Sequence, residues 1–160
     1  VRALLEPGAL AAAAEADVPV CLMHMQGQPD SMQQAPQYQD VITEVSQFLQ
    51  ARSQACVAAG ITKSQLILDP GFGFGKTLEH NMTMLAHFEA FCQHGLPVVA
   101  GISRKSSLGA ITGKDMAHRQ TASVAAALMA LERGAKILRV HDVDQTMDAV
   151  KIWVAAQEYL

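Results

Sequence analysis

Four short apolar segments constrain the fold of this chain more than any other feature of its sequence. They lie at residues 18–23, 66–68, 97–102 and 136–140 and consist mostly of leucine, valine, isoleucine and other apolar residues. Strands that are buried on both faces of a parallel sheet have this nearly continuous apolar pattern. Their starts lie about 30 to 50 residues apart, as in repeated strand–helix units. The sequence therefore predicts an α/β fold with a parallel sheet.

Helical patterns fill the intervals between these segments. Helices are expected at residues 8–16, 40–59, 77–95 and 121–133, and from residue 142 onward. Thr77 is a predicted N-cap, and Asp142 with Gln145 has the spacing of a capping box. The last helix is expected to carry the apolar residues Met147, Val150 and Val154. One helix followed by four strand–helix units fills either half of an eight-unit barrel or a small open doubly wound sheet.

Composition narrows the class of protein. The 160 residues suit one domain, half of them are hydrophobic, and the net charge is −3 with dispersed basic residues, so no nucleic-acid partner is expected. The longest apolar runs are short and rich in alanine, so no membrane span is expected. Cys21, Cys56 and Cys92 match neither a disulfide framework nor a metal knuckle. We expect them to be reduced core residues of a cytoplasmic protein.

Polar, charged or aromatic groups follow every predicted strand. These groups lie at residues 23–27, 69–76, 101–106 and 139–142. The carboxyl ends of parallel strands meet at one edge of the sheet, where α/β enzymes place their chemistry. Four such clusters on one edge therefore predict an active site.

The second cluster has two interpretations. Gly71, Gly75, Lys76 and Thr77 read as G-x-x-x-G-K-T, which is one residue short of a nucleotide-binding P-loop. A P-loop is therefore a weak alternative. Asp69 at a strand tip, followed by two phenylalanines on a glycine-rich backbone, suits a flat nitrogen-rich heterocycle instead. The competing structural interpretation is that Asp69 caps a turn and that both rings are core.

The third and fourth clusters favour anions. Ser106 with Arg104 and Lys105 precedes a short helix and suits a carboxylate or phosphate, unless the segment is simply a solvated basic loop. Arg139 and His141 alternate on the last strand, so both are expected to point the same way and to suit a phosphate or pyrophosphate. The other histidines outside the strand ends are expected to be surface or packing residues: His80, His87, His94 and His118. Side chains of this segment alone are not expected to bind a metal.

These four clusters resemble the motifs of the dihydropteroate synthases. Met-His-Met-Gln-Gly, Asp-Pro-Gly-Phe-Gly-Phe-Gly-Lys, Gly-Ile-Ser-Arg-Lys-Ser and Arg-Val-His-Asp-Val occur in that family's order and spacing. The resemblance implies parallel βα repeats that form the second half of a TIM-type (β/α)8 barrel, with the fifth to eighth strands and the fourth helix. Residues 1–160 are then a partial pterin-binding barrel domain without its N-terminal half.

The resemblance also implies roles for individual residues. Catalytic roles fall on Asp69, Lys105, Arg139 and His141. The pterin would contact Met23, Asp69, Phe74, Gly101, Lys105 and Arg139. The p-aminobenzoate would lie beside Phe72, Ser103, Arg104 and Ser106. Arg139 and His141 would hold the pyrophosphate that leaves.

The implied reaction condenses 6-hydroxymethyl-7,8-dihydropterin pyrophosphate with p-aminobenzoate to give 7,8-dihydropteroate and pyrophosphate, a step of folate biosynthesis that sulfonamides inhibit. Mg²⁺ is expected through the absent half and the substrate pyrophosphate. A homodimer is expected, and the isolated fragment is expected to be inactive. Two alternatives stay open: a non-catalytic pterin-binding or dimerisation fragment, and a pterin-binding methyltransferase relative, against which the Ser-Arg-Lys-Ser segment argues.

Overall fold

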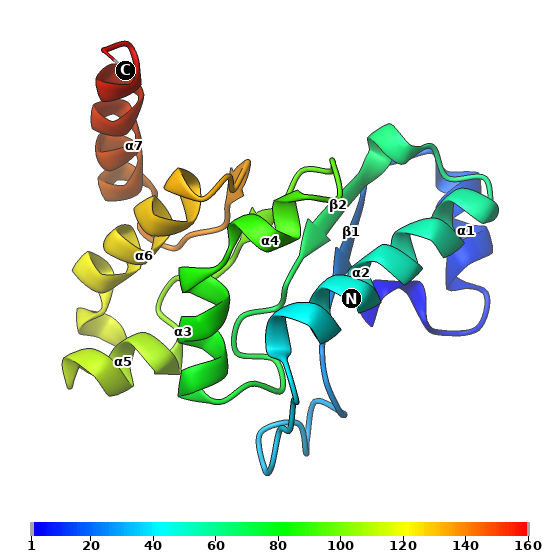
Figure 1. The fold of residues 1–160 in the computed structure, drawn as a ribbon, viewed down its shortest axis with the longest axis horizontal. Helices are drawn as coiled ribbons and strands as arrows, with labels where there is room; N and C mark the ends of the chain where they lie inside the picture. The colour runs from blue at the N-terminus through cyan, green and yellow to red at the C-terminus, as the bar shows by residue number, and fades with distance from the viewer. Residues whose placement is uncertain (1, 160) are drawn as a thin grey trace.

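The computed structural model describes residues 2–159; Val1 and Leu160, which end the predicted domain, lie outside the described residues. Seven helices and four strands follow one another along this part of the chain, with one or two helices after each strand (Figure 1). The helices are α1 (Ala9–Ala16), α2 (Val41–Ala58), α3 (Leu78–Ala86), α4 (Glu89–Cys92), α5 (Ser106–Thr112), α6 (Gln120–Glu132) and α7 (Val143–Gln157). The strands are β1 (Val20–Met23), β2 (Leu66–Asp69), β3 (Val99–Ala100) and β4 (Ile137–Leu138). Short 3-10 turns lie at Arg2–Leu4, Lys63–Gln65 and Met116–His118.

The strands are parallel and follow the order of the sequence. β1 pairs with β2 in a register that sets Met23 opposite Asp69, and β3 pairs with β4. A bridge between Leu68 and Val98 joins the two pairs. β3 and β4 are shorter than the apolar segments predicted, although the Arg139 N–H still donates to the Ala100 carbonyl at 3.0 Å. Arg139 and His141 therefore lie beyond the end of β4 and not on it.

The helices bury their apolar faces against the strands. In α2, Val45, Leu49 and Cys56 are fully buried, and Asp40 caps the helix by accepting from two backbone N–H groups. The helix expected at residues 77–95 is broken into α3 and α4. Phe88 lies at the break, and its buried ring stacks on Phe72 at a centroid distance of 6.2 Å. Burying this ring in the core takes precedence over continuing the helix.

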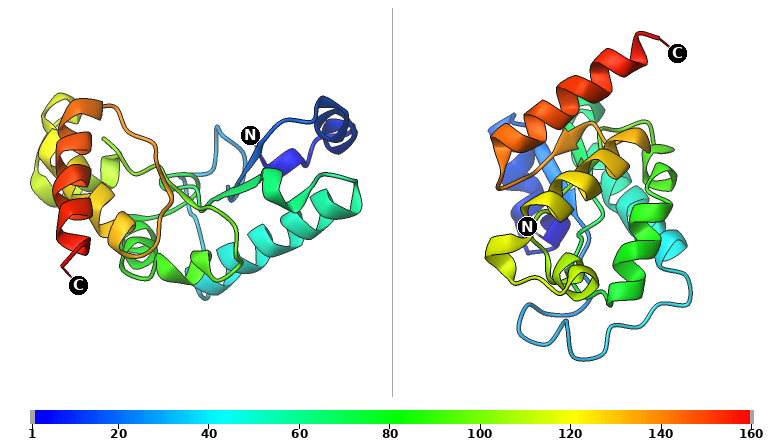
Figure 2. Two further views of the ribbon diagram at one scale, coloured as in Figure 1. Left: turned by 90° about the horizontal axis from the view of Figure 1, so that it is seen from above. Right: turned by 90° about the vertical axis from the view of Figure 1, so that its left-hand side faces the viewer.

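The last helix has a mostly exposed apolar surface. Figures 1 and 2 show α7 and α1 at opposite ends of the molecule, with α7 extending beyond α6. Met147 and Val154 are 46% and 49% exposed, so these two apolar residues are not buried within residues 2–159. The predicted capping box is wrong, because the Asp142 side chain makes no cap hydrogen bond and binds Arg104 instead.

The cysteines are free, as predicted, but they are not all core residues. Cys56 is buried and Cys92 partly buried, whereas Cys21 is exposed on the face of β1 opposite the buried Val20 and Leu22. Across residues 2–159, no helix is both long and apolar enough to cross a membrane.

Candidate active site

The ends of the strands bring the predicted groups together on one edge of the sheet. Asp69 ends β2 beside Met23, which ends β1. The Arg139 guanidinium comes from beyond β4, and its Nη2 lies 4.0 Å from the Asp69 Oδ2. Residues that are 70 positions apart in the sequence thus meet across the intervening strand β3, where Gly101 has no side chain to block the guanidinium.

Asp69 is a buried carboxylate that the loop beside it orients. Its side chain is only 6% exposed, and its Oδ1 accepts from the Gly71 N–H at 2.8 Å. Burial raises the pKa of Asp69, while the Gly71 hydrogen bond and the charges of Arg139 and Lys76 lower it. A carboxylate with one oxygen fixed by the backbone and the other directed toward a cation can accept from ring N–H and amino groups of a ligand.

Lys105 lies beside Asp69 on the loop that follows β3. Its Nζ lies over the Phe74 ring, 4.4 Å from the ring centroid. Burial and the neighbouring Arg139 lower the pKa of Lys105, and Asp69 opposes that shift. Gly101 lets Arg139 pass close, because a Cβ at that position would crowd the guanidinium. The site therefore holds two cations and one carboxylate beside a half-buried aromatic ring.

A second pair of contacts joins the loop after β3 to the segment after β4. The Ser103 Oγ lies 3.0 Å from His141 Nδ1 and also accepts from the His141 N–H at 3.2 Å. Arg104 binds Asp142 through two nitrogens, and this bidentate contact lowers the pKa of Asp142. Arg104 is a non-glycine residue with φ of 56°, a conformation that the Asp142 contact and the Ser123 hydroxyl help to hold.

Two of the predicted p-aminobenzoate residues are placed differently from the expectation. Phe72 is 1% exposed and stacks on Phe88 in the core, so its ring is not available to a ligand. The core interpretation of the phenylalanines is therefore right for Phe72 and wrong for Phe74. The Arg104 guanidinium is engaged by Asp142, so this side chain shapes the site from behind. Ser106 is exposed at the first position of α5.

Three residues that the sequence interpretation did not assign to the site lie directly beneath it. Lys76 is 3% exposed and His24 is 6% exposed, and their Nζ and Nδ1 atoms lie 2.9 Å apart. Asn81 is also buried and accepts from the Gly73 N–H at 2.8 Å. The signal in the sequence is a lysine directly after a glycine-rich loop, a pattern that also resembles part of a P-loop.

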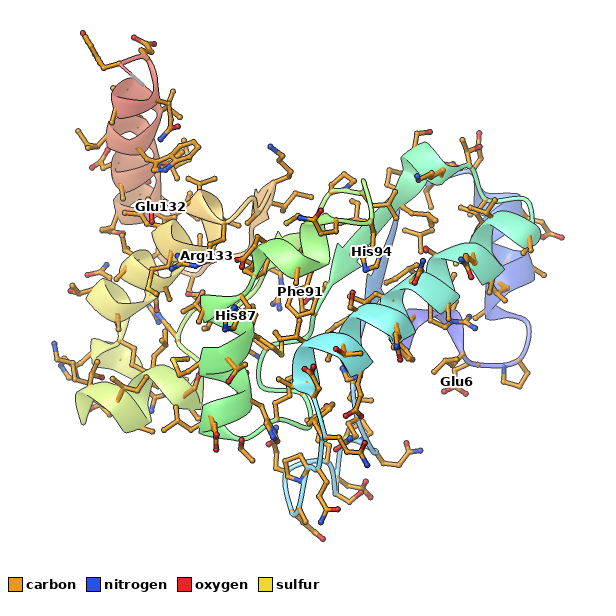
Figure 3. The ribbon with its side chains drawn as sticks, viewed as in Figure 1. Glu6, His87, Phe91, His94, Glu132 and Arg133 are labelled. Carbon is orange, nitrogen blue, oxygen red and sulfur yellow. The ribbon has the colours of Figure 1, made fainter. Side chains whose placement is uncertain are left out.

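The remaining histidines are exposed or partly buried, as expected for surface or packing residues. His87 and His94 lie on the helix layer (Figure 3), where His94 Nε2 contacts the Ser46 hydroxyl at 2.7 Å. His80 supports the N-terminus of α3, where Thr77 is the predicted cap. Across residues 2–159, no three His, Cys, Asp or Glu side chains converge as metal ligands.

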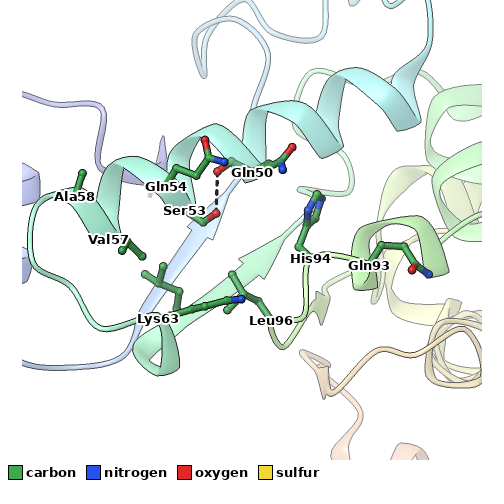
Figure 4. Close-up of a pocket in the computed structure, with 10 residues that line it drawn as sticks. Gln50, Ser53, Gln54, Val57, Ala58, Lys63, Gln93, His94 and Leu96 are labelled. Carbon is green, nitrogen blue, oxygen red and sulfur yellow. Dashed lines mark hydrogen bonds between the residues drawn. The ribbon is translucent and has the colours of Figure 1, made fainter.

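A groove of about 550 Å³ lies at the opposite end of the strands. It is bounded by α2, the start of β2 and the segment before β3 (Figure 4). Its lining consists of Gln50, Ser53, Gln54, Val57, Ala58, Lys63, Leu66, Gln93, His94 and Leu96. None of the predicted site residues is among them, so the groove is separate from the candidate site.

The sequence profile of the pterin binding enzymes matches residues 1–141. The chain belongs to the pterin-binding enzyme family. A dihydropteroate synthase of Haemophilus influenzae is 52% identical over 155 residues, which are 97% of this chain and 56% of that protein. The chain thus spans little more than half the length of the curated relatives that it matches.

Solved structures of the family confirm the predicted fold. A Yersinia pestis dihydropteroate synthase in complex with a sulfonamide drug superposes with a TM-score of 0.97 at 49% identity, over all of this chain and 58% of that one. A Xanthomonas albilineans dihydropteroate synthase in complex with 7,8-dihydropteroate gives a TM-score of 0.92 at 50% identity, over 98% of this chain and 57% of that one. The four strand–helix units are therefore part of a TIM-type barrel, and the open doubly wound sheet is excluded.

Proposed function

We propose that this chain supplies the Asp69, Lys105 and Arg139 side of a dihydropteroate synthase site. The supporting observation is the 4.0 Å approach of Arg139 to Asp69 beside the Lys105–Phe74 contact. This pattern joins a carboxylate and an aromatic ring, which suit a pterin, to cations that suit a leaving pyrophosphate. It occurs in a chain about half identical to synthases solved with 7,8-dihydropteroate or a sulfonamide.

The proposed reaction transfers the dihydropterin methylene from pyrophosphate to the amine of p-aminobenzoate. The methylene C–O bond breaks, and its electron pair leaves with pyrophosphate, toward Arg139 and His141. The cation that forms is delocalised over the pterin ring, where the Asp69 carboxylate stabilises it electrostatically. The amine then forms the new C–N bond and loses a proton. Lys105 lies between the two substrates, and Met23, Phe74 and Gly101 line the pterin side.

Ser103 and Ser106 border the proposed p-aminobenzoate position, where sulfonamides would compete. The sulfonamide complex of the Yersinia relative supports that competition. Arg104 serves this position indirectly. Its guanidinium binds Asp142, and this contact helps to hold the adjacent residues Ser103 and Lys105 in place.

Mg²⁺ does not fit the residues described here as a bound ion. No cluster of three His, Cys, Asp or Glu ligands forms among residues 2–159, so these side chains alone do not make a metal site. We propose that any Mg²⁺ in the reaction is held by the substrate pyrophosphate and by groups in the part of the relatives that this chain does not cover.

An assay with both substrates and Mg²⁺ tests the function. The fusion protein for this test joins the 160 residues to the part of a relative that they do not cover, and the unfused chain is assayed in parallel. We expect the fusion protein to form 7,8-dihydropteroate and the unfused chain to give no measurable turnover, because half of the barrel wall is then missing. An inactive fusion protein that folds would contradict the function, and an active unfused chain would contradict its dependence on a second half.

We further propose that the protein is cytoplasmic and forms a homodimer. Three free thiols suit a reducing compartment. The exposed apolar side chains of α7, including Val143 and Ile152 at 56% and 73% exposed, suit an interface between copies. Sedimentation of the fusion protein would measure its oligomeric state, and a monomer at micromolar concentration would contradict the homodimer.

A further inference from the structure

The Lys76 side chain has no part in the reaction described above, although it is one of the few buried charged groups. Its side chain reaches back beneath the loop that precedes it. Its Nζ donates to the Gly71 carbonyl at 3.0 Å and to the Phe74 carbonyl at 3.1 Å, and lies 2.9 Å from His24 Nδ1. An ammonium has three donors, and these contacts use all of them. Burying a cation is costly in free energy. That all three donors of the Lys76 ammonium have partners therefore indicates a defined role for this side chain.

The loop at residues 71–75 has no helix or strand to hold its shape. Gly71, Gly73 and Gly75 all have positive φ, so the backbone turns repeatedly and leaves carbonyls that no ladder satisfies. Lys76 contacts both arms of this loop, at Gly71 and at Phe74. Losing it would leave these buried carbonyls with fewer donors and would weaken the connection between the two arms, which the Phe74 N–H also makes by donating to the Gly71 carbonyl at 3.1 Å.

The same loop orients the groups of the candidate site. The Gly71 N–H fixes one oxygen of Asp69, and the Phe74 ring supports the Lys105 ammonium. Lys76 therefore holds Gly71, which contacts the Asp69 carboxylate proposed to bind the pterin. It also holds Phe74, which contacts Lys105. We propose that Lys76, paired with His24, is a positioning residue of the pterin site. This inference deepens the proposed function and rests on it for the identity of the ligand.

His24 is suited to pair with a buried lysine. Burial and the charge of Lys76 lower the pKa of His24 to about 3, so its ring stays neutral. The ring packs edge-on against Phe48 at 4.9 Å, which fixes its plane. A neutral imidazole accepts at Nδ1 from an ammonium and donates from Nδ1 to an amine by changing tautomer. The contact therefore persists whether or not Lys76 carries its proton.

The test compares Lys76→Met with Lys114→Met, which replaces an exposed lysine outside the site. Methionine keeps an unbranched side chain of similar length without any donor. Hydrogen–deuterium exchange is measured in the 160-residue chain and in the fusion protein. We expect Lys76→Met to accelerate exchange in residues 71–75 at least tenfold and to leave α2 unchanged, while Lys114→Met changes neither. Unchanged loop exchange, or equal acceleration in α2, would overturn the proposal.

Binding of 6-hydroxymethylpterin, followed by its own fluorescence, links the loop to the ligand. In the fusion protein we expect Lys76→Met to raise the Kd at least tenfold and Lys114→Met to leave it within twofold. Equal Kd values for Lys76→Met and the parent would overturn the positioning role. If the parent protein binds no pterin, the proposed function fails while the exchange result still decides whether Lys76 holds the loop.

Discussion

The loop after β2 and the segment after β4 both contribute to the candidate site, but the chain supports them very differently. Residues 71–75 are held from below by Lys76, His24 and Asn81, and Tyr38 donates to the Gly75 carbonyl at 2.9 Å. By contrast, the Arg139 side chain is 57% exposed, and β4 before it is two residues long.

This difference shows which half of the site is organised by the chain itself. The Asp69 side is backed by buried polar groups with defined partners, which fix one conformation. The Arg139 side is bounded by α7, whose apolar residues are largely exposed. We therefore expect the Arg139 side chain to adopt fewer rotamers when further protein covers that edge, because packed neighbours restrict side-chain conformations.

The substitution Gly71→Ala is the strongest test of the close packing in the loop after β2. Gly71 has φ of 73°, and a Cβ there would overlap the carbonyl oxygen of His24. Gly95→Ala is a matched control, since Gly95 has φ of 65° with no atom within 4 Å of a built Cβ. We expect Gly95→Ala to lower the free energy of unfolding by about 1 kcal/mol and Gly71→Ala by about 3 kcal/mol or more. Urea titration measures both, and equal losses would show that the loop tolerates displacement.

The charged groups of the two regions are tested together by Lys105→Ala and Arg139→Ala in the fusion protein. We expect each to lower kcat/KM by about 100-fold or more, which corresponds to about 2.7 kcal/mol of transition-state stabilisation. Initial rates at varied pterin substrate give these values. A loss below tenfold at both positions would contradict their assigned roles.

The sequence predicted the elements that depend on local pattern. Alternating apolar segments and helices gave the parallel order, and Asp69, Lys105 and Arg139 were placed at strand ends that the structure brings together. The predicted Thr77 cap is confirmed and follows from short-range chemistry.

The predictions that are wrong concern side chains whose partners lie far away in the sequence. Asp142 has the spacing of a capping box, yet it binds Arg104, which lies 38 positions away in the sequence. Phe72 and Phe74 are two residues apart and look equivalent, but only Phe74 faces Lys105. Lys76 looked like part of a P-loop because sequence spacing does not show which backbone carbonyls turn inward. Such choices depend on tertiary contacts that a linear pattern does not contain.

The buried cation of the first region is expected to make stability depend on pH. Burial lowers the pKa of Lys76 to about 7, below its ordinary value of 10.5. Between these values the unfolded chain binds more protons than the folded chain, so stability rises with pH. From pH 7 to 8.5 we expect the free energy of unfolding to increase by about 1.5 kcal/mol. Urea titrations at both pH values measure this increase.

Lys76→Met should abolish that increase, whereas Lys114→Met should retain it. The chosen range lies above the titration of His24, whose lowered pKa removes stability only as the pH falls below about 6.5. A parent protein with the same stability at pH 7 and 8.5 would contradict the buried-cation account of the loop.

The exposed apolar surface of α7, which follows the segment after β4, allows a test of the second half of the comparison. Ile152 on α7 is 73% exposed, and Val57 on α2 is 48% exposed at the groove of Figure 4. If copies of the protein associate through α7, burial of Ile152 contributes to binding and a lysine there opposes it. We expect Ile152→Lys to weaken self-association about fivefold, or about 1 kcal/mol, and Val57→Lys to leave it unchanged. Sedimentation equilibrium gives both constants. An equal effect at the two positions would mean that the exposed face of α7 is not the interface, and the contrast between the two regions would then need another explanation.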